Sequence, residues 1–269
     1  MRTLVHLSDL HFGRVDTALI APLTELIAKL APHVLVVSGD LTQRAKSAEF
    51  IAARAFLDTL PSPQIIVPGN HDISLYNVFN RFLRPLDKYT RYITADLAPF
   101  YVDAEIAILG VNTARSLTVK DGRINADQMA TVRARLAPLP DHLVKVIVTH
   151  HPFDLPAHYN PDDLVDRAPA ALDAFADCGA DLLLAGHLHA SHAQTTQERY
   201  PSSGYAALAV QAGTATSTRG RGESNSFNVL RVESMHIGVE RFAWDPASAR
   251  FVHASTEEFV RQGACWQPQ

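Results

Sequence analysis

The chain has 269 residues, of which 47% are hydrophobic and 19% charged, so it can bury a sizeable core and is not disordered by composition. Lysine and arginine number 24 against 28 aspartates and glutamates, and the net charge of −4 argues against a protein that binds duplex nucleic acid. No apolar run approaches the ~18 residues of a membrane span, residues 1–7 do not resemble a signal peptide, and two cysteines cannot form a disulfide framework. We therefore expect a cytoplasmic protein with reduced thiols.

Over the first two thirds of the chain, short β-branched runs alternate with stretches of helical hydrophobic spacing. This βαβ order predicts a parallel sheet with crossover helices. We expect strands at 3–7, 34–37, 65–67, 106–111, 144–148 and 181–184, and helices at 19–30, 50–60, 126–136 and 169–176.

The last third differs, because strand-like runs at 205–210, 227–232, 237–244 and 250–253 follow one another with turns between them. The pattern predicts antiparallel strands here. We expect an α/β fold with two sheets in a single domain over 1–269, with the part from about 234 as an antiparallel extension.

Five of the predicted strands are followed by polar residues of the same kinds. The carboxyl ends of strands in an open α/β sheet converge on one crevice, so these side chains should meet in space. Aspartate and histidine together suit Mn, Fe, Zn, Ni or Co, whereas Ca and Mg prefer all-oxygen cages and structural zinc sites use cysteine. The residues are Asp9 and His11, Asp40, the run Asn70-His71-Asp72, the pair His150-His151, and His187 with His189.

Asp9 and His11, and likewise His187 and His189, are spaced by two residues, which places both side chains on one side of an extended segment. The set holds too many ligands for one ion, whereas two ions ~3.5–4 Å apart that share a carboxylate would use all of them. Asp40 stands alone after its strand, and its two oxygens can bridge. Each motif alone is more typical of a turn or a cap, but their joint occurrence, each after a strand, favours a pair of metal ions.

These motifs resemble the calcineurin-like metallophosphoesterase superfamily from residue 3 to about 232, with no substitution at a ligand position. The runs Ser8–His11, Val67–Asp72, Thr149–Pro152 and Ala212–Thr214, followed by Asn225–Asn228, are similar to bacterial class III cyclic nucleotide phosphodiesterases. The resemblance implies a four-layer α/β/β/α sandwich of two mixed sheets flanked by helices. A catalytically inactive scaffold with this fold is the alternative, but such proteins typically lose ligands.

The resemblance also implies the role of each motif residue. His71 matches the family's catalytic histidine and Asp72 the carboxylate that orients it. The two metal sites implied are Asp9, His11, Asp40 and His189 for the first ion, and Asp40, Asn70, His150 and His187 for the second.

The expected site has a net charge near +1, because two divalent ions contribute +4, the carboxylates of Asp9 and Asp40 contribute −2 and a bridging hydroxide contributes −1. This charge suits a singly charged phosphodiester. We expect this hydroxide to attack phosphorus, with Asn70 stabilising charge and His71 binding the phosphoryl group or protonating the leaving oxygen. Manganese and iron are the favoured metals. The expected substrates are 3′,5′-cyclic nucleotides, and the alternative is a lipid-linked nucleotide or a phospholipid headgroup at a membrane surface.

Further residues have weaker signals. Asn112 ends a predicted strand and Arg219 lies in the glycine- and serine-rich loop 217–226, so both are candidate substrate contacts. His151 directly follows a ligand and in a strand would point away from it. The segment 76–92 alternates aromatic and basic residues, which favours a helix packed on the core over one that binds a membrane surface. The sequence leaves open whether the protein forms a homo-oligomer.

Overall fold

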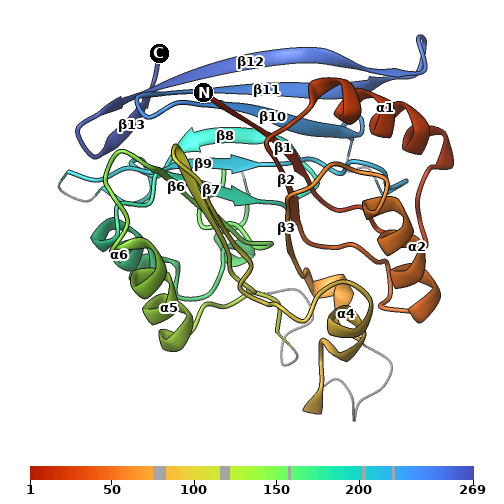
Figure 1. The fold of residues 1–269 in the computed structure, drawn as a ribbon, viewed down its shortest axis with the longest axis horizontal. Coiled ribbons are helices and arrows are strands. Elements are labelled where there is room, and N and C mark those ends of the chain that lie inside the picture. Colours follow the sequence, from red (N-terminus) through yellow and green to blue (C-terminus); the bar gives the residue numbers. More distant parts are fainter. Residues whose placement is uncertain (75–82, 116–121, 157–158, 202–203, 220–221) are drawn as a thin grey trace.

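The computed structural model describes residues 1–74, 83–115, 122–156, 159–201, 204–219 and 222–269. Within them, two β-sheets pack face to face and helices cover the outer face of each (Figure 1). None of the described helices is both long and apolar enough to cross a lipid bilayer. The predicted four-layer sandwich is confirmed.

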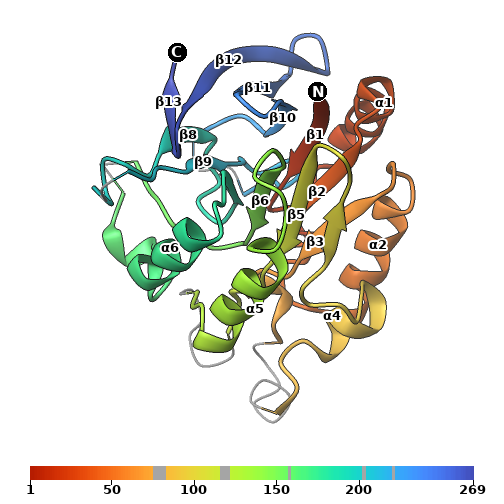
Figure 2. The same cartoon turned by 60° about the vertical axis from the view of Figure 1, so that its left-hand side comes forward.

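The first sheet, within the described residues, has seven strands. β1, β2 and β3 pair in parallel, and β10 to β13 pair antiparallel, with β10 lying against β1. The C-terminal strands therefore extend the first sheet (Figure 2). In spatial order the strands are β13 (Cys265–Pro268), β12 (Arg250–Gln262), β11 (His236–Asp245), β10 (Ser226–Val232), β1 (Arg2–Leu7), β2 (Val34–Ser38) and β3 (Gln64–Val67).

The second sheet has six strands in the described part of the chain. Its four central strands are parallel, and an antiparallel strand closes each edge. In spatial order they are β4 (Phe100–Val102), β5 (Ile106–Gly110), β6 (Val144–Val148), β7 (Leu182–Ala185), β9 (Leu208–Gln211) and β8 (His192–Thr195).

Side-chain alternation along the strands separates three apolar layers. In β1, Leu4 packs between the two sheets, while Val5 and Leu7 pack under the helices of the first sheet. In β6, Val146 likewise faces the other sheet and Ile147 faces the helices of the second. The first sheet is covered by α1 (Ile20–Leu30), α2 (Ser47–Leu57) and α4 (Asp87–Tyr92), and the second by α5 (Ala126–Leu136) and α6 (Ala168–Asp177).

One prediction about the last third is wrong. Residues 208–210 of the run predicted at 205–210 lie in β9, which belongs to the second sheet and pairs in parallel with β7 and antiparallel with β8. The antiparallel pairing of β10, β11 and β12 is confirmed, and β13, which was not predicted, pairs antiparallel with β12.

The aromatic and basic segment 76–92 is described only from residue 83 onward, so Tyr76, Phe79 and Phe82 lie outside the described residues. In the described part, Tyr89 is fully buried and its hydroxyl donates to the Ile66 carbonyl at 3.0 Å. Lys88 Nζ donates to the Ala45 carbonyl at 2.8 Å. Leu86, Tyr89 and Tyr92 of this part pack on the core, whereas Leu83 is exposed.

Candidate metal centre

Five of the predicted ligands adopt a left-handed backbone conformation. L-residues rarely do so, because the Cβ atom then crowds the following carbonyl at a cost of roughly 1–2 kcal/mol each. Such strain is typical of functional positions, where the surrounding structure fixes the residue. The φ angles are 52° at Asp9, 49° at His11, 53° at Asp40, 73° at His187 and 60° at His189.

Two glycines allow the ligand loops to approach one another. A Cβ atom on Gly69 would lie 2.1 Å from Asp40 Oδ1, and one on Gly186 would lie 1.8 Å from Ser8 Oγ. Both distances are far inside van der Waals contact. The loops after β2 and β3, and those after β1 and β7, can therefore meet only with glycine at these positions.

Asp9, His11 and His189 form one buried group. His11 Nε2 and His189 Nε2 are 3.2 Å apart, and Asp9 Oδ1 lies 3.2 Å from His189 Nε2 and 3.5 Å from His11 Nε2. The other oxygen of Asp9 accepts from Ser8 Oγ at 2.6 Å and from the backbone N–H of His187 at 3.0 Å. Asp9 Oδ1 is thereby left to face the two imidazoles.

Asp40 connects this group to a second one. Its Oδ2 lies 3.7 Å from His11 Nε2, and its Oδ1 lies 3.4 Å from His150 Nε2. His150 Nε2 is in turn 3.0 Å from Asn70 Oδ1 and 3.3 Å from His187 Nδ1. A carboxylate whose two oxygens face two ligand groups has the geometry of a bridging ligand.

The second group fits a cation. His150 Nδ1 lies 2.8 Å from the Ser38 carbonyl, which can only accept a hydrogen bond, so this nitrogen carries a proton. In the neutral form that binds a metal, His150 Nε2 has a lone pair, and it points at the side-chain oxygen of Asn70, another acceptor. Two acceptors 3.0 Å apart in a buried site repel each other unless a positive ion lies between them.

The pKa shifts of Asp9 and His187 agree with this conclusion. Burial raises the pKa of Asp9, but the nearby His189 and His11 outweigh it and hold that pKa well below its ordinary value. Burial, together with the neighbouring His151 and His150, keeps the pKa of His187 well below normal, so this ring is neutral. Ionised carboxylates and neutral imidazoles are the forms that bind metals.

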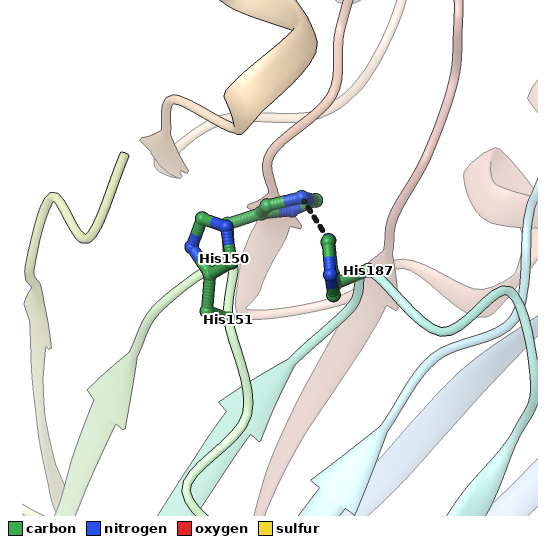
Figure 3. A group of neighbouring side chains, drawn as sticks. All are labelled: His150, His151 and His187. Carbon is green, nitrogen blue, oxygen red and sulfur yellow. Dashed lines mark hydrogen bonds between the residues drawn. The ribbon is translucent and has the colours of Figure 1, made fainter. Parts of the chain in front are cut away.

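His151 joins the cluster, contrary to the prediction that it points away. β6 ends at Val148, so the strand alternation behind that prediction does not extend to residues 150 and 151. The His151 ring centroid lies 4.8 Å from that of His150 and 4.7 Å from that of His187, and the three rings gather at one point (Figure 3). The Thr113 hydroxyl lies 2.9 Å from His151 Nδ1.

His71 lies beside the first group, with its ring 4.9 Å from that of His11. Its Nδ1 donates to the Gln43 carbonyl at 2.8 Å, which leaves Nε2 directed away from that carbonyl. The sequence-based role of Asp72 needs correction here. The Asp72 carboxylate accepts four hydrogen bonds, none from the His71 ring: they come from the backbone N–H groups of Leu41, Thr42 and Gly69 and from the Thr42 hydroxyl.

Asp72 therefore holds together the loops after β2 and β3, and the Gln43 carbonyl orients His71 instead. Burial, with the charge of Asp40 nearby, raises the pKa of Asp72 to about 6.

The two predicted substrate contacts have different surroundings. Arg219 borders the cluster: its Nη1 lies 3.0 Å from His71 Nε2, and its carbonyl accepts from His189 Nδ1 at 3.1 Å. Asn112 caps a local turn, where its Oδ1 accepts from Ala114 N at 2.9 Å, and it lines a cavity of about 70 Å³ beside α5. Its neighbour Thr113 provides the contact with the cluster.

A sequence model of the calcineurin-like phosphoesterase family matches residues 2–191, which include every candidate ligand and His71. The chain belongs to the calcineurin-like phosphoesterase family. The resemblance inferred from the motifs is thus confirmed, and the two ligand groups fit a family of metal-dependent phosphoesterases.

Among curated proteins, this family member is 27% identical over 165 residues to the glycerophosphodiester phosphodiesterase GpdQ of Enterobacter lignolyticus (strain SCF1). The match covers 56% of this chain and 58% of that protein's length.

Two solved structures share the fold at low identity. The purple acid phosphatase PPD1 from yellow lupin (Lupinus luteus) seeds has a TM-score of 0.72 and 12% identity, over 97% of this chain and 54% of that one. A dimetal phosphatase from Danio rerio has a TM-score of 0.66 and 14% identity, and the match covers 94% of this chain and 98% of that one.

Proposed function

We propose that this chain is a metal-dependent phosphodiesterase that hydrolyses small phosphodiesters, with 3′,5′-cyclic nucleotides as the principal substrate class. The observation that carries the proposal is the buried convergence of carboxylate and imidazole atoms around Asp40, which offers metal ligands in two adjacent places. Asp9, His11, Asp40 and His189 would hold one ion. Asp40, Asn70, His150 and His187 would hold the other.

When bound, the ions supply Lewis-acid charge to the phosphoryl group and lower the pKa of water so that hydroxide forms near neutral pH. Manganese and iron are the metals we propose. Two divalent ions bring +4, of which Asp9 and Asp40 offset −2. The remaining positive charge favours a substrate that is itself an anion, and a phosphodiester carries one negative charge.

His71 is the residue we propose to act on the leaving group. Its Nδ1 is engaged by the Gln43 carbonyl, and its Nε2 lies where Arg219 Nη1 meets it at the edge of the ligand groups. Once it has taken up a proton at Nε2, a ring held in this way can donate that proton to a phosphoryl or leaving-group oxygen. An alkoxide leaving group, as in a cyclic nucleotide, needs a proton more than an activated phenolate does.

Glycerophosphodiesters are a second candidate class, favoured by the matched relative, whose name is glycerophosphodiester phosphodiesterase. Their leaving group is also an alkoxide, so the same residues would serve. A lipid-linked nucleotide or phospholipid headgroup at a membrane is less favoured, because the described part of 76–92 packs on the core.

A substrate panel on manganese-loaded protein tests the proposal. We expect turnover of bis(p-nitrophenyl) phosphate, and a higher kcat/KM for 3′,5′-cyclic AMP than for glycerophosphocholine. The reverse order would assign the site to glycerophosphodiesters. Absence of turnover of every diester with Mn²⁺, Fe²⁺, Co²⁺, Ni²⁺ and Zn²⁺ would refute the phosphodiesterase proposal.

A further inference from the structure

A row of small hydroxyl residues attaches the segment before Arg219 to the loop that carries Asp9 and His11. The Thr214 hydroxyl donates to the Asp9 carbonyl at 2.7 Å, and the Thr216 hydroxyl donates to the Leu10 carbonyl at 2.9 Å. Both threonines are buried. The segment that leads to Arg219 is thus anchored to the same loop that carries Asp9 and His11.

Backbone pairing continues the attachment up to Arg219. The N–H of Asp16 donates to the Thr216 carbonyl at 2.9 Å, and the N–H of Thr218 donates to the Arg14 carbonyl at 2.9 Å. The N–H of Arg219 then donates to Ser217 Oγ at 3.1 Å. The backbone of Arg219 is therefore fixed on both sides of the peptide, by Ser217 at its N–H and by His189 at its carbonyl.

The guanidinium of Arg219 ends at the ring of His71. Because the Gln43 carbonyl accepts from His71 Nδ1, His71 Nε2 carries the lone pair of the neutral ring and accepts from Arg219 Nη1 at 3.0 Å. Among the ion pairs between described residues, none involves Arg219. Its positive charge has no carboxylate partner there.

We propose that Arg219 is a substrate-binding residue that holds a non-bridging oxygen of the phosphodiester, next to the oxygen that faces His71 Nε2. The inference rests on the proposed function. His71 Nε2 marks a position from which an acceptor reaches Arg219 Nη1, and a phosphoryl oxygen beside it would be a second acceptor. The planar guanidinium fork matches two oxygens of one phosphoryl group, which a lysine ammonium does not.

Binding of inorganic phosphate to manganese-loaded protein, measured by calorimetry and as competitive inhibition, tests the inference in wild type, Arg219→Gln and Arg219→Lys. We expect Arg219→Gln to weaken phosphate binding and raise KM for bis(p-nitrophenyl) phosphate roughly ten- to hundred-fold, since a charge-assisted hydrogen bond is lost. The phosphate affinity of Arg219→Lys should lie between that of wild type and that of Arg219→Gln. The metal content should stay at the wild-type value, because the backbone carbonyl that accepts from His189 is retained.

Arg231→Gln is the matched control. Arg231 is a half-buried arginine on β10, paired with Glu240 at 2.9 Å on a different part of the sheet, and its loss should leave phosphate affinity unchanged. Wild-type phosphate affinity in Arg219→Gln at unchanged metal content would overturn the inference. Calorimetry separates the phosphate-binding role of Arg219 from the proposed phosphodiesterase activity. If wild type turns over no diester, weaker phosphate binding in Arg219→Gln would still support the binding role. Equal phosphate binding in wild type and Arg219→Gln would still reject it.

Discussion

The ring of His71 is oriented at Nδ1 by the Gln43 carbonyl, 2.8 Å away, and its Nε2 lies 3.0 Å from Arg219 Nη1. We expect His71→Ala to reduce kcat for a cyclic nucleotide by roughly 10²–10⁴-fold, the usual range for loss of a general acid. The same change should affect bis(p-nitrophenyl) phosphate much less, because nitrophenolate leaves without a proton. Parallel steady-state measurements on both substrates check this, and equal losses would leave His71 with charge stabilisation alone.

His6 is a fully buried histidine whose pKa is lowered by burial from 6.5 to about 3. Between pH 6.5 and 3 the unfolded chain binds a proton that the folded chain does not, so stability falls as the pH falls through this window. From pH 7 to pH 5 we expect this residue alone to reduce the free energy of unfolding by about 2 kcal/mol.

Urea unfolding at the two pH values, in wild type and His6→Gln, measures this contribution. The variant should lose about 2 kcal/mol less than wild type between pH 7 and pH 5. His142→Gln, at an exposed position, should respond to pH as wild type does. If His6→Gln kept the full pH response of wild type, burial of a neutral His6 would not be its source.

Single residues also show where sequence reasoning stops. The motifs predicted which residues gather, because strand ends converge whatever the details of the loops. The roles of Asp72 and His151 depended on loop geometry: Asp72 bonds to backbone N–H groups that no motif identifies, and His151 lies beyond the end of β6. For the same reason, the sequence pointed to Asn112 as the substrate contact, whereas its neighbour Thr113 is the residue that contacts His151.

At the level of elements, α4 is fixed to the first sheet by the hydroxyl of Tyr89, which donates to the Ile66 carbonyl at 3.0 Å. Tyr89→Phe removes a buried donor and leaves that carbonyl without this partner, so we expect a loss of roughly 1–2 kcal/mol in the free energy of unfolding. Urea denaturation measures the loss.

Tyr92→Phe on the same helix is the control. Its ring stacks on Phe50, while its hydroxyl makes no hydrogen bond to any described residue. Its stability should stay within about 0.5 kcal/mol of wild type. Equal losses in both variants would mean that aromatic packing, not the Tyr89 hydrogen bond, fixes the helix.

The hydrophobic pattern predicted the boundaries of elements that have a regular buried face. It did not predict the end of a strand whose side chains are exposed. The helix over 126–136 was predicted with the bounds that the structure has, since its apolar spacing is regular and Asn125 caps it. In contrast, β12 continues to Gln262 although the prediction ended at 253. Most side chains over 252–258 are exposed, so pairing with β11 maintains the strand and no apolar alternation marks it.

For the whole molecule, the ligand loops come from both sheets, so bound ions should stabilise the fold as a unit. A metal that binds only the folded state adds about 2.7 kcal/mol at a hundred times its Kd. We expect a chelator to lower Tm by several degrees. Asp40→Asn, which weakens both ligand groups, should show a smaller drop on chelation because less metal is bound to begin with. A wild-type Tm that does not respond to the chelator would contradict this expectation.

The central claim is that segments distant in sequence form one buried site for two cations. Elemental analysis of purified protein, after incubation with Mn²⁺ and removal of free ion, measures this most directly. We expect two ions per chain in wild type and fewer than two in Asp40→Asn. Fewer than two tightly held ions in wild type would contradict the account.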